Sequence, residues 1–146
     1  MNRRRIHLEL SKLEDFQNNC NLVQSPFVLF LACDATTFSA DVIGDFAGEA
    51  LKKGMVYFCA WGPDCERVHD VVDEVIVMNN LESRGNTIMT SWHNKESLKE
   101  ALQFAEWATP VGDDIEETDK DLVVVTVANS AWSKAVNKML AKFASK

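Results

Sequence analysis

The sequence predicts an α/β fold, a three-layer Rossmann-like or flavodoxin-like sandwich in which helices cover both faces of a mostly parallel sheet. Several short runs, among them residues 27–33 and 122–128, are apolar throughout, which is typical of strands that helices cover on each side. Segments of helical periodicity alternate with these runs. We expect roughly four to five strands and about four helices in a single domain, residues 1–146.

Residues 1–25 are expected to form an N-terminal arm or an edge strand, because Ile6, Leu8 and Leu10 alternate with more polar residues. The run Arg3-Arg4-Arg5 within this segment is interpreted as a solvated terminus, although three arginines could also contact a phosphate. The first buried strand is expected to follow at residues 27–33.

The best-defined helix of the sequence follows this strand. Ser39 is a suitable N-cap, and apolar residues recur after it at helical spacing. The run Lys52-Lys53-Gly54 closes the helix with two cations and a glycine suited to a left-handed C-cap. Gly44 and Gly48 predict that the backbone of this helix approaches the sheet closely. Residues 55–61 predict the second buried strand.

The middle of the chain is predicted to contain a helix, two strands and another helix. Pro63 suits the first position of a helix, and residues 74–78 predict a third strand. Residues 87–92 predict a fourth strand, which either forms a hairpin with the third or is not its neighbour. Asn94 is the expected cap of the next helix, which the dipeptide Thr109-Pro110 stops.

The last part of the chain begins with an acidic segment. Residues 111–121 hold six acids against one lysine, so we expect a solvated acidic loop that could also engage a basic partner. The last buried strand is expected at residues 122–128, and Ser130 is expected to cap the final helix. The residues of this helix that we expect to face inward are Trp132, Val136, Met139, Leu140 and Phe143.

Composition excludes several classes of function. The net charge of −7 argues against binding to nucleic acid, which needs a basic surface. The longest apolar run has seven residues and cannot cross a membrane, which takes about 20 residues in a helix. No export signal is visible, so we expect a cytoplasmic protein whose four cysteines are free thiols.

Residues that could bind a ligand or partner follow the predicted strands. The carboxyl ends of parallel strands meet at one edge of the sheet, where α/β proteins bind their ligands. This rule places the segments 34–37, 61–66, 91–94 and 129–130 at that edge. The candidate binding residues among them are Asp34, Trp61, Asp64, Trp92 and His93. The two tryptophans offer stacking faces and N–H donors, or else they cap the core beneath the loops. Asn79-Asn80 is expected at the same edge, after the predicted third strand.

Cys65 and His69 lie four residues apart at the start of a predicted helix. This spacing fits a thiolate nucleophile with a base, half of a metal site, or ordinary residues of a first helical turn. Asp64 and Glu66 flank the thiol and disfavour a thiolate, whereas the helix N-terminus favours one. There is no CxxC or HxxxH pair, so we expect no metal and interpret these residues as ordinary ones.

Common catalytic and cofactor signatures are absent. Asp34 ends a strand, as in haloacid-dehalogenase-like phosphohydrolases, but these have a second aspartate where this chain has Thr36. A receiver domain would need a phospho-acceptor aspartate where Asn79-Asn80 stands. The turn from Asp34 to Ser39 contains no glycine, which excludes a P-loop and a dinucleotide fingerprint, and no G-x-S-x-G elbow exists. We therefore expect no cofactor.

Two motifs carry a resemblance to a known family. The segments Ala60-Trp-Gly-Pro-Asp-Cys65 and Thr90-Ser-Trp-His93 resemble motifs of an uncharacterised family of small bacterial α/β proteins. The resemblance is strongest over residues 55–108. It implies an α/β domain and a bacterial origin, and it assigns no catalytic residue.

Two hypotheses of function remain open. The first is a noncatalytic accessory or immunity-like module that binds an unknown protein partner or a small ligand at the edge described above. The second is a small hydrolase or transferase that uses Cys65, His69, His93 and Asp34. Both predict that Asp34, Trp61, Cys65 and His93 line one concavity. An edge strand or the apolar side of the last helix offers a surface for a homodimer.

Overall fold

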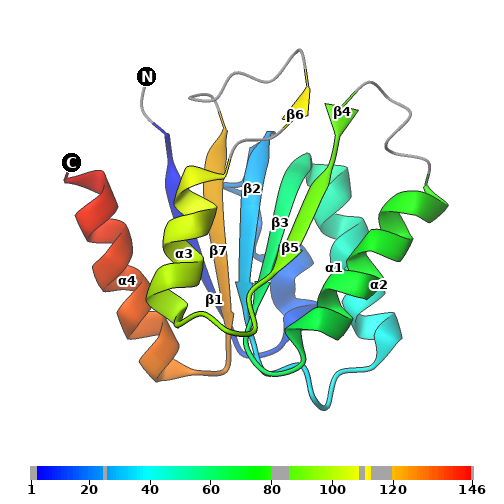
Figure 1. Cartoon of the computed structure of the whole chain (residues 1–146), viewed down its shortest axis with the longest axis horizontal. Helices are drawn as coiled ribbons and strands as arrows, with labels where there is room; N and C mark the ends of the chain where they lie inside the picture. Colours follow the sequence, from blue (N-terminus) through cyan, green and yellow to red (C-terminus); the bar gives the residue numbers. More distant parts are fainter. Residues whose placement is uncertain (1–2, 25, 80–85, 109–110, 113–119, 146) are drawn as a thin grey trace.

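A computed structural model of the chain describes residues 3–24, 26–79, 86–108, 111–112 and 120–145. Its centre is a sheet of five parallel strands in the order β1-β7-β2-β3-β5 (Figure 1). The strands are β1 (Arg5–Leu10), β2 (Phe27–Ala32), β3 (Met55–Trp61), β5 (Met89–Trp92) and β7 (Asp121–Val127). Two short strands, β4 (Asn86–Thr87) and β6 (Val111–Gly112), pair antiparallel as a separate ribbon. The predicted α/β sandwich is confirmed.

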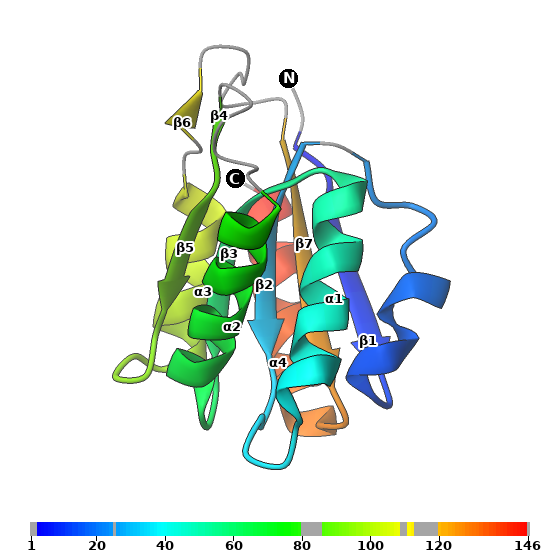
Figure 2. The same cartoon turned by 90° about the vertical axis from the view of Figure 1, so that its right-hand side faces the viewer.

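Helices cover both faces of this sheet (Figure 2). The first face carries the 3₁₀ helix η1 (Leu13–Asn18) and two α-helices, α1 (Ala40–Lys53) and α2 (Cys65–Met78). The second face carries α3 (Leu98–Trp107) and α4 (Ser130–Ala144). None of the helices in the described part of the chain is long and apolar enough to cross a membrane.

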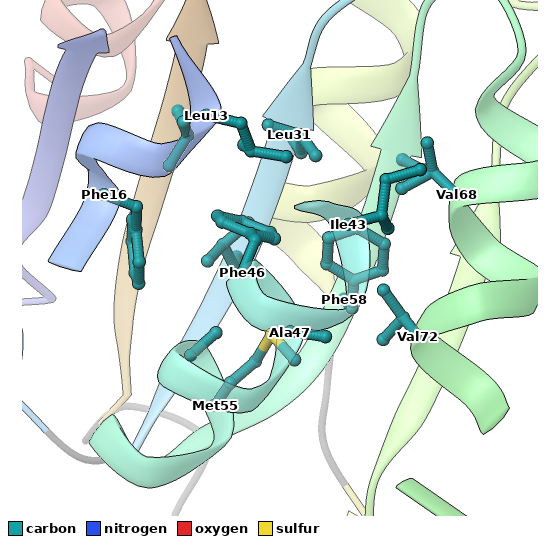
Figure 3. Close-up of a cluster of buried hydrophobic side chains, with 14 of the residues drawn as sticks. Leu13, Phe16, Leu31, Ile43, Phe46, Ala47, Met55, Phe58, Val68 and Val72 are labelled. Carbon is teal, nitrogen blue, oxygen red and sulfur yellow. The ribbon is translucent and has the colours of Figure 1, made fainter. Parts of the chain in front are cut away.

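The larger of the two cores fills the space between the sheet and the helices of the first face (Figure 3). Phe46 of α1 lies at its centre and packs edge-on against Phe16 of η1, with ring centroids 4.9 Å apart. Phe58 of β3 contacts the same ring from the sheet, at 6.4 Å. Because strand side chains alternate between the faces, Leu29 and Leu31 of β2 enter this core, while Val28 and Phe30 enter the second one.

The N-terminal segment is an edge strand, one of its two predicted forms, because among the described strands β1 pairs only with β7. The three arginines that precede and open β1 all have partners, and only Arg4 is exposed, so the expectation of a solvated terminus was wrong for Arg3 and Arg5. Arg3 and Arg5 both bind the carboxylate of Glu106 on α3, and their side chains are 11% and 20% exposed. Arg4 binds Asp121 at 2.6 Å. More than a hundred residues separate these partners in sequence, so local composition did not reveal them.

The predicted third strand, residues 74–78, is the last part of α2, which corrects the expectation of a strand there. The segment is rich in β-branched residues and is locally suited to a strand. Val68, Val72 and Ile76, however, recur every four residues and are all buried against the sheet, so packing continues the helix. A hairpin with residues 87–92, one of the two predicted alternatives, therefore does not form, and Asn79 is the C-cap of a helix rather than the end of a strand.

Three helix starts differ from the predicted ones by one to three residues. The first residue of α2 is Cys65, and Pro63 precedes its N-cap, Asp64. Ser97, not Asn94, caps α3 in a capping box with Glu100, and Asn129 rather than Ser130 caps α4. Sequence spacing identifies a suitable cap residue, but several such residues lie near each helix start, and tertiary packing selects among them.

Two further expectations need correction. A Cβ at Gly44 would meet Val75 and Val71 of α2 at 3.9 and 4.0 Å, so this glycine lies close to a helix and not to the sheet, while Gly48 has no neighbour within 4 Å. Asp121 belongs to β7 and is buried, although it was assigned to the acidic loop. Most of that loop, residues 113–119, and the predicted stop at Thr109-Pro110 lie outside the described residues.

Candidate ligand site at the carboxyl edge of the sheet

The topology creates a crevice at the carboxyl edge of the sheet. From β2 the chain continues into α1 on one face, and from the neighbouring β7 it continues into α4 on the other. The loops after these two strands therefore diverge, which in open α/β sheets marks the usual position of a ligand. A crevice of about 450 Å³ lies at this point.

The crevice is lined by polar side chains and one aromatic wall. Asp34, Thr36, Thr37 and Phe38 come from the loop between β2 and α1. Asn129 and Trp132 come from the start of α4, and the other lining residues are Ser11, Lys12, Pro63, Val127 and Ala128. A carboxylate, an ammonium group, hydroxyls and an amide thus surround one space, which gives it both donors and acceptors of hydrogen bonds.

Asp34 is held in place by its own loop. Its Oδ1 atom accepts hydrogen bonds from the Thr36 N–H at 3.0 Å and from the Thr36 hydroxyl at 2.6 Å. These bonds favour the charged form and hold the pKa of the Asp34 carboxyl below its usual value. Oδ2 accepts no bond from the described residues, so the carboxylate remains an anionic acceptor for a ligand.

Arg67 of α2 fixes the shape of this loop. Its guanidinium group donates to the carbonyl oxygens of Ala35 at 2.6 Å and Phe38 at 2.8 Å. Asp64 accepts from the same guanidinium group at 2.7 Å and orients it. Asp64, a predicted ligand-binding residue, therefore acts on the crevice wall through Arg67 and is not part of the lining.

The corner between β3 and α2 packs directly against the end of β2. Gly62 has a φ of +114°, and a Cβ at this position would collide with the carbonyl oxygen of Cys33. Only glycine fits both the backbone conformation and the close approach. The Ala35 N–H bonds to the Pro63 carbonyl at 3.1 Å, which joins the two loops. The motif around Gly62 thus supports one side of the crevice.

The tryptophan in the lining is Trp132, which the sequence placed only among the inward-facing residues of the last helix. The predicted Trp61 packs edge-on against Trp132, with ring centroids 5.0 Å apart. Its indole N–H already donates to the carbonyl oxygen of Glu96 at 2.9 Å. Trp61 thus supports the aromatic wall from behind and does not line the crevice itself.

Cys65 begins α2 but is buried, with 3% of its surface exposed. Burial raises the pKa of its thiol, and a backbone hydrogen bond from His93 offsets part of this rise. Cys33, which follows β2, is also buried, and its thiol pKa is raised to about 12. A thiol with a raised pKa is a weak nucleophile at neutral pH. All four cysteines of the chain are buried and free.

His93 lies beyond the end of β5, on the face that α3 covers. The ring is 6% exposed and lies against Phe104, with centroids 4.7 Å apart. Its Nδ1 atom is 3.2 Å from the Glu96 carboxylate and its Nε2 atom is 2.9 Å from the Ser91 hydroxyl. Burial lowers the pKa of His93, while the Glu96 charge opposes the shift. Both ring nitrogens have partners within the protein.

His69 lies on the opposite face of β5, in a second polar cluster. Its Nε2 atom is 3.0 Å from the Thr90 hydroxyl, and its Nδ1 atom is 3.0 Å from the Asp70 carboxylate. Thr90 donates to Asp73 at 2.6 Å. Trp92, which is 40% exposed, covers the imidazole ring with centroids 4.5 Å apart. These contacts join the edge strand β5 to α2.

The five predicted binding residues and the candidate catalytic residues therefore occupy three neighbouring environments rather than one concavity. Asp34 lines the crevice, whereas Trp61, Cys65 and His93 are not part of its lining. Among the described residues, no three histidine, cysteine or acidic side chains converge so that they could hold a metal ion. Sequence reasoning missed Lys12 and Trp132, whereas it did place Thr36, Thr37 and Asn129 at this edge, and all three line the crevice. The same rule that selected Asp34 also selected Asn129, because it directly follows an apolar run, and this was the one signal that pointed to the start of α4, where Trp132 lies.

Comparison with known proteins places the chain in a family. Searches of the curated proteins and of the solved structures found no match. The sequence profile of a family described as a domain of unknown function, DUF7684, matches residues 6–143, which extend from β1 into α4. The chain belongs to the DUF7684 family of uncharacterised domains.

Proposed function

We propose that this protein is a noncatalytic binding module that takes a small polar ligand in the crevice between the ends of β2 and β7. The observation that carries the proposal is the position of the crevice, where the loops of neighbouring parallel strands diverge to opposite faces of the sheet. Two further observations support it. The carboxylate of Asp34 has a free oxygen, and Trp132 offers an aromatic wall beside it.

The lining favours a small hydroxylated ring, such as a sugar or the ribose of a nucleoside. Adjacent hydroxyl groups pair well with a carboxylate and an amide, which Asp34 and Asn129 supply. The side-chain carbonyl oxygen of Asn129 accepts a hydrogen bond from the Trp132 backbone N–H at 3.0 Å. The side-chain NH₂ group of Asn129 is therefore left to donate to a ligand. The flat apolar face of such a ring packs on an indole, here that of Trp132.

A titration of the labelled protein with D-ribose, D-glucose, adenosine and uridine, followed by NMR, tests this proposal. We expect at least one probe to shift the Trp132 indole and the Asn129 side-chain amide. Asp34→Asn should weaken its binding by about tenfold or more, because one charged hydrogen bond contributes roughly 1.5–3 kcal/mol. Asp45→Asn, on α1 and outside the crevice, is the matched control and should bind as the wild type does.

Two outcomes of the titration would overturn the proposal. One is that none of the four probes shifts Trp132 or Asn129. The other is that a probe binds equally well to the wild type and to Asp34→Asn. In either case the crevice does not recognise hydroxylated rings through Asp34.

The alternative function, a small hydrolase, has one observation in its favour. Thr90, His69 and Asp70 form a hydroxyl–imidazole–carboxylate relay with two contacts of 3.0 Å, the order of groups used in nucleophilic catalysis. It ranks second for two reasons. The Thr90 proton is already donated to Asp73, and Trp92 covers the imidazole. Turnover of p-nitrophenyl acetate that Thr90→Val abolishes and Thr90→Ser retains would favour the hydrolase over the binding module.

A further inference from the structure

A groove runs between α3 and α4 on the second face of the sheet. Figure 1 shows these two helices side by side, and they are in contact. The groove has a volume of about 520 Å³. Its apolar floor includes Leu98 of α3 with Met139 and Phe143 of α4, and these side chains are only partly buried. An apolar groove between helices is a known way to hold a third helix.

The rim of this groove is basic, although the chain as a whole carries a net charge of −7. Lys99, Lys138 and Lys142 line it, and no acidic residue does. The ammonium groups of these three lysines form no ion pair or hydrogen bond with the described residues. The acids of α3 have other partners, since Glu106 binds Arg3 and Arg5, and Glu100 belongs to the capping box. The positive charge of the rim is therefore not neutralised by these neighbours.

The geometry of α4 brings the apolar and basic residues together. Ala135, Lys138, Met139, Lys142 and Phe143 recur at intervals of three, four, seven and eight residues and so form one stripe along the helix. The stripe at Val136 and Leu140 is buried against the sheet. Helix α4 thus buries one side in the core of the second face of the sheet. A second side, which carries both apolar and basic residues, lies along the groove.

We propose that this groove docks an acidic amphipathic helix of a partner protein. The apolar side of that helix packs on Leu98, Met139 and Phe143, while its carboxylates pair with Lys99, Lys138 and Lys142. Charge complementarity selects this occupant, because a basic or neutral helix would leave the ammonium groups without partners. The site is distinct from the crevice that contains Asp34, so the two proposals stand or fall separately.

A pair of synthetic peptides tests this proposal. Both are amphipathic helices with leucines along one side, and the flanking positions are glutamate in the first and lysine in the second. Fluorescence anisotropy with the full chain should show binding of the glutamate peptide at least about tenfold tighter than that of the lysine peptide. Binding of the glutamate peptide should weaken as salt is raised, because added ions screen exposed charges beyond about 10 Å at 0.1 M.

Two double variants locate the site. Lys138→Glu with Lys142→Glu should weaken binding of the glutamate peptide about tenfold or more. Lys52→Glu with Lys53→Glu, at the end of α1 on the other face of the sheet, changes the net charge by the same amount and should retain more of the affinity. Circular dichroism and thermal melting establish that both variants fold.

Several outcomes would overturn the proposal. They are equal binding of the two peptides, an equal loss of affinity in both double variants, and failure of the glutamate peptide to bind. Binding of phosphatidylserine vesicles, if lost with Lys138→Glu and Lys142→Glu while the peptide does not bind, would identify a membrane surface instead. Self-association of the wild type that the same variant abolishes would identify a second copy of the chain.

Discussion

At the scale of single residues, burial decides which of the reactive side chains are available for chemistry. Cys65 and His93 have the residue types of a nucleophile and a base, but both are nearly inaccessible to solvent. Burial favours the neutral form of each group, so the pKa of the Cys65 thiol is raised and the pKa of the His93 imidazole is lowered. Asp34, in contrast, is exposed and charged, with one oxygen turned to its own loop. The accessibility of these side chains therefore favours the proposal that Asp34 recognises a ligand over catalysis by Cys65.

The buried His93 predicts a dependence of stability on pH. Its pKa is lowered in the folded state, so between that value and the unfolded value of about 6.5 the unfolded chain binds more protons. The free energy of unfolding should therefore fall as the pH decreases through this window, by at most about 1.4 kcal/mol per pH unit from this group. Urea unfolding of the wild type and of His93→Gln between about pH 5 and 7 measures the difference. An identical slope in the two proteins would contradict the prediction.

At the scale of elements, the corner between β3 and α2 decides how the crevice is built. Strand β3 ends at Trp61, the chain turns at Gly62, and α2 begins at Cys65. Several contacts connect this corner to the end of β2 and the loop after it. Among them are the close approach of Gly62 to Cys33, the bond between Ala35 and Pro63, and the two Arg67 bonds. The corner thus determines the position of the loop that carries Asp34.

Substitution of Gly62 tests the importance of this corner. Gly62→Ala should destabilise the protein by on the order of 3 kcal/mol, because the new Cβ collides with the Cys33 carbonyl and the φ of +114° is strained for alanine. Gly48→Ala is the matched control, since its Cβ would meet nothing within 4 Å in the interior of α1. This control should gain about 0.5–1 kcal/mol of stability. Equal effects of the two substitutions on urea unfolding would refute the role of Gly62.

At the scale of the whole molecule, the two edges of the sheet are attached differently. The edge strand β5 is joined to α2 through His69 and Thr90, which lie 21 residues apart. The edge strand β1 is joined to distant parts of the chain, because Arg3 and Arg5 bind Glu106 of α3 and Arg4 binds Asp121 of β7. These ion pairs add to the backbone pairing of β1 with β7 and connect residues more than a hundred positions apart in the chain, so they close long loops of the fold.

Glu106 is the shared partner in two of these three ion pairs. Glu106→Gln removes the negative charge between two largely buried arginines and should destabilise the protein by about 1–3 kcal/mol. Limited proteolysis should then cleave near β1 earlier than in the wild type. Glu49→Gln is the control, because its lysine partner lies 3.6 Å away and is 75% exposed, so its loss should cost less than about 0.5 kcal/mol. A Glu106→Gln protein as stable as this control would contradict the argument.

Much of the fold followed from local patterns in the sequence. The strands at residues 27–33, 55–61 and 122–128 were predictable because runs that are apolar on both faces have few other places in a folded protein. Helix α1 was predictable in full, since Ser39 and Gly54 act at its ends through local backbone geometry. The failure at residues 74–78 shows the limit of this approach, because a short β-branched run suits both a strand and a buried helix stripe.

The sequence by itself determined the α/β class and the presence of Asp34 at the carboxyl edge, since both follow from the pattern of one short segment at a time. Only the tertiary structure decided that Trp132 rather than Trp61 lines the crevice, and that Cys65 and His93 are buried. It also decided that Arg3, Arg4 and Arg5 have partners. The physical reason is the same in each case. Side-chain environment depends on strand order and on which helix covers which face, and these arise from contacts between segments far apart in the chain.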